Sequence, residues 1–288
     1  MTPDLTPLLL AAIPMFGWGL IQLLAARLSR AVGYMLAGLL VQAGGLAGTL
    51  LLAPMFLRVP AGINWFGLAF LGVSGLIFYL LLYRALGAAE VSLVAPIVSS
   101  WGLVTALMGI AIAGDSVTPL KVLCMLAISV GIVLLSVNWT GVQRVSAARL
   151  MPGIAPALAV ALGWGVTYYY LKPLNDQMGW YVTTVGTRFF TVLAFLPLAL
   201  LRSGDLRRVL PKVPWALALG IVVLDIFAYT SYNYALTRYE VSLVSIIASA
   251  SPLVSVIGAW LLLHERLSAL QKIGVAVVIA GILGMQIR

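Results

Sequence analysis

One stretch of about fifty residues occurs twice at a constant spacing of 150 residues, and it constrains the fold more than any other feature of the sequence. In the first copy Tyr79 is followed by Glu-Val-Ser-Leu-Val at 90–94, and in the second Tyr229 is followed by the same five residues at 240–244. The two copies align without a gap. The sequence therefore consists of two copies of one structural unit.

The composition indicates where such a unit folds. Of the residues, 62% are hydrophobic and 9% are charged, whereas a soluble domain has about 25% charged residues. A helix needs about 20 apolar residues to cross the hydrocarbon core of a bilayer, and the apolar runs of this chain have that length. The strands of a β-barrel would instead alternate over about ten residues. The sequence predicts an all-α, polytopic membrane protein.

Charged residues, prolines and glycines divide the chain into ten such runs. The expected spans are residues 5–26, 32–56, 63–83, 91–113, 119–137, 153–171, 180–201, 214–236, 241–263 and 268–287. We assign 1–137 to a first five-helix repeat, 138–151 to a linker and 152–288 to a second five-helix repeat. Because five is odd, the second repeat must enter the membrane in the opposite orientation. Inverted repeats of this kind occur in transporters, with the substrate site near the midplane between them.

Basic residues are dispersed among the loops, so the net charge of +9 indicates membrane topology rather than nucleic-acid binding. Eleven Lys and Arg residues lie in the loops after odd-numbered spans, against five on the other side. The positive-inside rule then predicts that the first set of loops is cytoplasmic and that both termini lie outside. We expect a multi-pass protein of the cell (inner) membrane.

Several motifs resemble one family of transporters. They are Gly17-Trp18-Gly19, its counterpart Gly163-Trp164-Gly165, the two Glu-Val-Ser-Leu-Val blocks, and a closing segment of His264-Glu265-Arg266-Leu267 followed by Gly274 and Gly281. In these motifs the chain resembles the ten-helix, EamA-type branch of the drug/metabolite transporter superfamily. The resemblance implies two inverted five-helix repeats around a central cavity, and export or exchange of small metabolites such as amino acids, amines or sugars. The first copy departs from the closing pattern, with Gly114-Asp115-Ser116 at the corresponding place.

Arg188 and Asp225 are charged residues inside predicted spans, at similar depth in two adjacent helices. A charge near the bilayer centre costs about 2.5–3.5 kcal/mol on insertion scales, so such residues usually pair and face a cavity. The pair either binds a charged or zwitterionic substrate, acts as a proton-responsive switch, or joins two helices as a structural ion pair. Their counterparts 150 residues earlier, Gly38 and Gly75, carry no charge, so the predicted site is asymmetric.

Aromatic and hydroxyl side chains complete the predicted cavity. Trp18 and Trp164 lie between glycines that admit a neighbouring helix or a ligand, and an indole offers a flat apolar face with one donor. Each aromatic residue has the alternative of an ordinary packing role. The expected substrate-binding residues are Trp18, Tyr79, Ser99, Trp101, Trp164, Tyr168, Arg188, Asp225, Tyr229 and Ser249.

Two further pairs lie near the repeated block. Pro96 and Pro252 each remove a backbone donor from a span, which predicts either hinges for rocking one bundle against the other or fixed kinks. Glu90 and Glu240 precede the fourth and ninth spans, where a carboxylate meets the positive end of the helix dipole. We favour this helix-end role over a role as proton carriers.

No enzyme motif is found in the sequence: metalloprotease, phosphate-loop and Cys/His-cluster patterns are missing. With one cysteine and one histidine we expect no enzymatic activity, no cofactor and no metal site. The sequence favours a monomeric secondary transporter that moves amino acids or amphipathic amines by alternating access. Its expected partners are a small-molecule substrate, the lipid bilayer and a coupling proton, with no nucleic acid. The alternatives are a sugar or phosphorylated-sugar transporter of the same fold, a channel, and a membrane-embedded sensor or enzyme.

Overall fold

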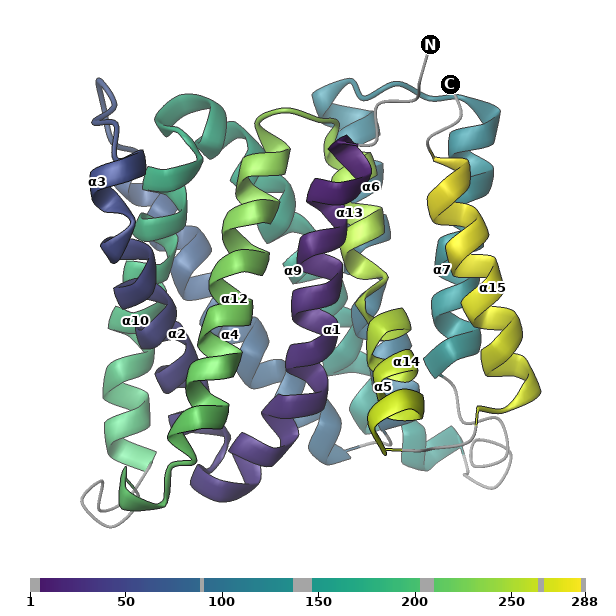
Figure 1. The fold of residues 1–288 in the computed structure, drawn as a ribbon, viewed down its shortest axis with the longest axis horizontal. Coiled ribbons are helices and arrows are strands. Elements are labelled where there is room, and N and C mark those ends of the chain that lie inside the picture. The colour runs from purple at the N-terminus through teal and green to yellow at the C-terminus, as the bar shows by residue number, and fades with distance from the viewer. Residues whose placement is uncertain (1–5, 89–90, 137–146, 203–209, 264–266, 286–288) are drawn as a thin grey trace.

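The computed structural model describes residues 6–88, 91–136, 147–202, 210–263 and 267–285, and every regular element in these ranges is a helix (Figure 1). The first half of the chain forms α1 (Thr6–Val32), α2 (Tyr34–Leu51), α3 (Ala53–Phe56), α4 (Trp65–Ala88), α5 (Val91–Ser99), α6 (Trp101–Met108), the π-helical turn η1 (Gly109–Ala113) and α7 (Pro119–Ser136). The second half forms α9 (Ala147–Met178), α10 (Trp180–Arg202), the 3₁₀ turn η2 (Leu210–Lys212), α12 (Trp215–Leu236), α13 (Val241–Ser249), α14 (Ser251–Leu263) and α15 (Ala269–Gly284).

These helices confirm the prediction of an all-α membrane protein. Within the described ranges, nine helical segments are long and apolar enough to cross a bilayer, and α15 is a tenth, shorter apolar helix. Each of the ten predicted spans overlaps one of them. Helix α1 begins and α15 ends at the same edge of the bundle (Figure 1), as an even number of spans requires.

The sixth span is longer than predicted. The expectation was a helix that stops at Lys172-Pro173, but α9 continues to Met178. The last turns are held by an ion pair between Lys172 and Asp176, at 2.6 Å, and by Asn175, whose amide donates to Asn233 on α12. Gly179 then ends the helix with φ of +82°, a conformation that glycine adopts without steric cost. The local effect of one proline is therefore outweighed by a local ion pair and by the contact with Asn233, which forms only in the folded chain.

Equivalent spans of the two halves run in opposite directions. In the pair α7 and α15, an added Cβ at Gly281 would meet Cys124 and Ile128, whereas one at Gly274 would meet Gly131 and Leu135. Residue numbers thus rise along α7 as they fall along α15, and Figure 1 shows the two helices side by side. The small residues let these backbones approach closely, as is common for helices packed in lipid. This antiparallel relation is the one that an odd number of spans per half predicts.

The two halves are also joined because the first helix of each half packs against a helix of the other half. Helix α1 packs on α12, and α9, its equivalent in the second half, packs on α4. The largest core cluster includes Trp101, Tyr232 and Val244, on α6, α12 and α13, and extends to buried residues of helices from both halves. Along α13 every residue except Leu243 is buried, so this helix is the most enclosed in the described bundle. Between the halves lies the cavity described next.

Candidate functional site

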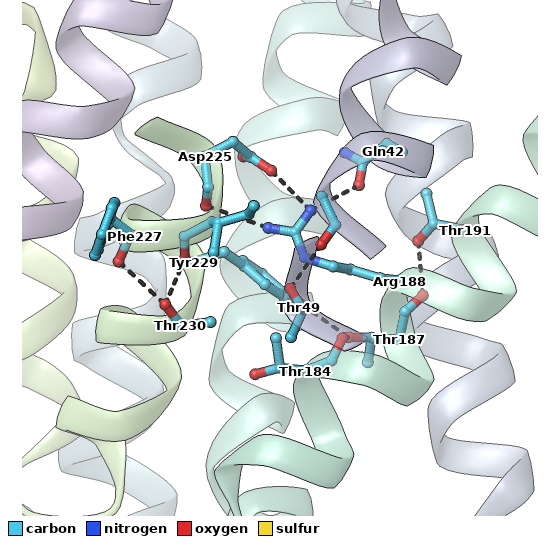
Figure 2. Close-up of polar contacts among 12 residues, drawn as sticks. Gln42, Thr49, Thr184, Thr187, Arg188, Thr191, Asp225, Phe227, Tyr229 and Thr230 are labelled. Atoms are coloured by element: carbon cyan, nitrogen blue, oxygen red, sulfur yellow. Dashed lines mark hydrogen bonds and ion pairs between the residues drawn. The ribbon is translucent and has the colours of Figure 1, made fainter. Parts of the chain in front are cut away.

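Arg188 and Asp225 form an ion pair in the middle of the bundle. Nη1 of Arg188, on α10, lies 2.7 Å from Oδ2 of Asp225, on α12. Nη2 donates to the backbone oxygen of Asp225 at 3.2 Å, and Nη1 also donates to Oε1 of Gln42 on α2 at 3.4 Å (Figure 2). Three helices from both halves therefore converge on one guanidinium group.

The pair is removed from water. The side chain of Arg188 is 3% exposed and that of Asp225 is 14% exposed. Cζ of Arg188 also lies 4.7 Å from the centre of the Tyr229 ring, in range for a cation–π contact. The Nε of Arg188 has no hydrogen-bond partner among the described residues. Since a buried donor without a partner costs about 1–3 kcal/mol, the site holds one donor that a ligand could satisfy.

Gly45 on α2 makes room for this ion pair. A Cβ added at Gly45 would lie 2.9 Å from Cζ of Arg188 and 3.2 Å from Oδ2 of Asp225. Such distances are shorter than side chains tolerate, so any other residue here would push the guanidinium away from the carboxylate. The sequence thus positions the charges through a small residue on a third helix.

Threonines give α10 a hydroxyl face beside Arg188. Thr187 donates to the backbone oxygen of Thr183, and Thr191 donates to that of Thr187 and to that of Gly72 on α4. The Oγ1 of Thr187 also lies 3.1 Å from the hydroxyl of Tyr229. The spacing of four residues places these hydroxyls on one side of the helix, so they form one polar wall.

Aromatic rings form the other wall. The ring of Trp18, on α1, lies 5.5 Å from that of Tyr168, on α9. Trp101 lies behind them, 4.4 Å from Tyr168 and 5.9 Å from Trp18. The ring of Tyr232 completes the cluster at 5.2 Å from Tyr168. Edge and tilted contacts of this kind contribute about 0.5–1.5 kcal/mol per pair beyond the area they bury, so the wall is well fixed.

Between the two walls is a cavity of about 130 Å³. It is lined by Trp18, Gln42, Leu71, Gly75, Tyr79, Trp164, Thr167, Tyr168, Leu171, Thr187, Arg188, Thr191, Phe195, Asp225 and Tyr229. Both halves contribute. A charged pair, several hydroxyls and five aromatic rings of Trp and Tyr thus face one small space, which can bind a molecule with a polar end and an apolar body.

Seven of the ten residues expected to bind substrate line this cavity: Trp18, Tyr79, Trp164, Tyr168, Arg188, Asp225 and Tyr229. Trp101, Ser99 and Ser249 are not among the lining residues. Trp101 is 6% exposed because Trp18 and Tyr168 stand in front of it. Ser249 is 1% exposed and donates to the backbone oxygen of Ile246, and Ser99 is buried as well. Their helices lie beside the site without reaching it.

The sequence analysis missed several lining residues. Gln42 is a lone amide in an apolar span, which is a signal of the same kind as Arg188. Thr187 and Thr191 follow a spacing of four residues that also marks a helix face. The apolar positions 71, 171 and 195 could not be told from ordinary packing residues, because their neighbours come from other helices.

The glycines on either side of the two tryptophans serve helix packing. A Cβ at Gly17 would lie 2.8 Å from Ala228 on α12, and one at Gly19 would lie 2.6 Å from the backbone of Ser251 on α14. Gly163 and Gly165 face α4 and α6 in the same way. The sequence analysis predicted that these glycines admit either a neighbouring helix or a ligand. Each of the four faces a neighbouring helix.

The fourth and ninth spans are both broken, but the breaks do not coincide with the prolines. The fourth span is interrupted at Ser100, between α5 and α6, and the ninth at Ala250, between α13 and α14. These two positions are 150 residues apart, whereas Pro96 and Pro252 are not equivalent positions of the repeat. Pro96 lies inside α5, whereas Pro252 is the second residue of α14, in the first turn after the break at Ala250. Whether the breaks act as hinges stays a prediction.

At the edge of the bundle where the chain ends lie, Glu240 forms a second ion pair. Its carboxylate accepts from Nζ of Lys121 at 2.6 Å and from the backbone nitrogen of Ser116 at 2.9 Å. Burial raises the pKa of Glu240, but these hydrogen bonds outweigh burial and the pKa is lowered overall. Glu240 occupies the N-cap position of α13 as predicted, yet its side chain does not cap; Asp115 accepts from the nitrogen of Ser242 instead. Glu90 lies outside the described residues.

A second cavity of about 430 Å³ lies between α4 and α9. It is lined mainly by apolar side chains, among them Phe66, Phe70 and Leu174, with Asn64 and Gln177 at one end. Phe66 and Phe70 are 82% and 53% exposed on the outside of the bundle. Although this cavity is larger, it holds no charged group, so we place the site at Arg188 and Asp225. No group of three or more metal-ligating side chains was found among the described residues.

Comparison with known proteins gives two results. Residues 151–286 match the EamA-like transporter family. A solved structure that bears only the name "Crystal structure of protein" has a TM-score of 0.81 to this chain at 18% identity, and the match covers 97% of this chain and 96% of that one. At this identity the likeness concerns the fold alone. No curated protein sequence matches the chain. The resemblance predicted from the sequence motifs is thus confirmed for residues 151–286, which include Gly163-Trp164-Gly165 and the second Glu-Val-Ser-Leu-Val block.

Proposed function

We propose, from the match of residues 151–286 to the EamA-like transporter family, that this protein is a membrane transporter of small molecules and, more specifically, a secondary transporter of amphipathic metabolites. Amino acids are the foremost candidates and organic amines come next. The observation that carries the proposal is the buried Arg188–Asp225 pair, which lines a central cavity opposite a wall of aromatic rings. The proposed mechanism is alternating access, because both halves line the cavity.

The chemistry of the pair suits a zwitterion. The unpartnered Nε–H of Arg188 can donate to a carboxylate, and guanidinium groups bind carboxylates with defined geometry. The carboxylate of Asp225 lines the same cavity and can accept from an ammonium group. The apolar body of the substrate would then lie against Trp18 and Tyr168. A cargo with both charges could replace the intramolecular ion pair without leaving a charge unpaired.

Phosphorylated sugars fit this site less well. Among the described lining residues Arg188 is the one cationic side chain, and Asp225 already neutralises it. A phosphate group carries up to two negative charges, so its binding would leave net negative charge next to Asp225. Such burial is unfavourable in a membrane interior. The site therefore supports amino acids or amines over phosphorylated cargo.

The remaining parts of the proposal follow from this reading. The sequence has no nucleotide-binding loop, so transport would be driven by a gradient or by exchange, with a proton as the proposed coupling ion. We place the protein in the cell (inner) membrane as a monomeric exporter or exchanger without enzymatic activity.

Transport by the purified protein in liposomes tests the proposal. Labelled amino acids, amines and sugars are supplied with and without a pH gradient, and uptake is compared for the wild type, Arg188→Gln, Asp225→Asn and Phe227→Leu. Phe227 is the matched control, because it lies two residues from Asp225 on α12 but is 64% exposed on the outside of the bundle.

We expect saturable uptake of amino acids or amines that is stimulated by the same cargo inside the liposomes. Arg188→Gln removes the charged donor of the proposed contact with the cargo, so uptake by this variant should fall about tenfold or more. Uptake by Phe227→Leu should match that of the wild type. The proposal fails if only sugars are transported, if flux does not saturate, or if Arg188→Gln retains full activity.

A further inference from the structure

Gly75, in α4, differs from nearly all other described glycines within helices. At eighteen such positions an added Cβ would lie 3.0 Å or less from another atom, as at Gly72, where the backbone oxygen of Thr187 would be 2.7 Å away. At Gly75 the nearest atom would be Oγ1 of Thr191, at 3.9 Å. Gly220, in α12, is the other open case, and it is exposed on the outside of the bundle. Gly75 instead lines the central cavity.

Helix packing therefore does not explain a glycine at position 75. In membrane helices glycine usually allows two backbones to approach, and otherwise it weakens a helix relative to alanine. A methyl group at Gly75 would make only an ordinary van der Waals contact with Thr191 and clash with nothing, so its consequence would be a smaller cavity. The missing side chain creates space beside Tyr79 and Leu71, one turn away on either side.

The position of Gly75 in the repeat indicates which part of a cargo this space could hold. Gly75 is the counterpart of Asp225 at the spacing of 150 residues, and both residues line the cavity. The second half thus places a carboxylate, Asp225, at a position where the first half has no side chain, at Gly75. A zwitterionic head held by Arg188 and Asp225 would have its body directed to the uncharged half.

We propose that Gly75 forms the base of a subsite for the apolar body of the cargo, and that the absence of a side chain there sets the largest body that fits. The subsite rests on the proposed function, since it needs a cargo whose head is held by the ion pair. The ligand class is an amino acid or amine with a bulky apolar side chain. Gly75 is a specificity-determining residue in this assignment.

Uptake of three labelled amino acids with side chains of increasing size tests the subsite. Alanine, leucine and tryptophan are compared in liposomes with the wild type, Gly75→Ala, Gly75→Leu and the control Gly220→Leu. We expect the tryptophan-to-alanine uptake ratio to fall about tenfold or more in Gly75→Leu, since small volume changes in a pocket discriminate by roughly 10–200-fold. Gly75→Ala should give a smaller drop in the same direction, and Gly220→Leu should keep the wild-type ratio.

The outcomes separate the two proposals. If the wild type transports none of the three amino acids, the proposed function fails and the subsite fails with it. If the wild type transports them and Gly75→Leu keeps the same ratio, only the subsite is refuted. Uniform loss of all three substrates in Gly75→Leu also refutes it, because a size limit must act on the largest cargo first. If Gly75→Leu does not fold, the ratio measured for Gly75→Ala decides.

Discussion

Removing one charge of the central ion pair should destabilise the protein strongly. In Asp225→Asn the shape of the side chain is kept, but the guanidinium of Arg188, whose side chain is 3% exposed, loses its counter-charge. Two unit charges about 4 Å apart interact by about 4 kcal/mol at an effective dielectric constant of about 20. Breaking a buried pair by removing one partner costs about 3–5 kcal/mol in measured cases. We therefore expect Asp225→Asn to lower the free energy of unfolding by about 3–5 kcal/mol.

Removing both charges should have a much smaller effect. A buried pair that is replaced by apolar residues of similar volume is often neutral for stability, because the desolvation cost of both ions disappears with their attraction. The free energy of unfolding of the double variant Arg188→Met/Asp225→Leu should thus lie within about 1 kcal/mol of that of the wild type. It should nevertheless transport nothing, because the groups proposed to bind the cargo are gone.

Reversible unfolding in mixed micelles of dodecyl sulfate, followed by far-ultraviolet circular dichroism, measures these differences. Phe227→Leu is the control for a substitution nearby on α12. The reasoning is refuted if Asp225→Asn unfolds like that control, or if the double variant is as unstable as the single one. Retained transport by the stable double variant would show that the pair is a structural link between helices and not part of the binding site.

Three other predictions concern positions that the structure fixes. Gly45→Ala should destabilise the protein by about 1–3 kcal/mol through overpacking against the ion pair and should slow transport, whereas Gly220→Ala should do neither; unfolding and uptake assays compare the two. Because the pKa of Glu240 is lower in the folded than in the unfolded chain, its contribution to stability is complete above the unfolded pKa and is lost as the pH falls through the folded pKa. The melting temperature of the wild type should therefore drop in acid more steeply than that of Lys121→Met, and parallel curves would contradict this. Gly131→Leu should separate α7 from α15, since a Cβ there would already lie 3.0 Å from the backbone of α15. Loss of a cross-link between cysteines placed in the two helices would report this separation. An unchanged cross-link would count against the predicted close packing.

The spans were predictable because the membrane imposes one length and one polarity on each of them. Thus α10 and α12 begin and end within one residue of the predicted bounds. Predictions failed where tertiary contacts override local signals. The last turns of α9 are held by Asn233 on another helix, so the helix passes Pro173 and ends before Gly179. The interruption at Ser100 could not be located either, since the visible signal, Pro96, lies inside a continuous helix.

The candidate site was predictable in its charges and less so in its outline. Arg188 and Asp225 are costly in a bilayer unless they meet, so their pairing followed from depth alone. For the aromatic residues, the sequence could not distinguish those that line the cavity from those that pack behind it. Trp18 and Trp101 are equally apolar and equally central in sequence, yet one faces the cavity and the other lies behind it. That difference depends on the rotation of each helix about its axis, which the packing partners determine and the sequence pattern does not.

The comparison of the two halves separates what the repeat shares from what it does not. Packing of α7 on α15 and the interrupted fourth and ninth spans occur at equivalent positions, and they concern how the halves fit together. The charges occur once. At the counterpart of Arg188, Gly38, an added Cβ would lie 2.8 Å from the hydroxyl of Tyr79, so that half uses the same position to pack an aromatic ring. A second ion pair would add the cost of two more buried charges and would let a cargo bind in two opposed orientations. Under the proposed function, a single pair would let the second half hold the polar end of the cargo and leave the first half to select its size.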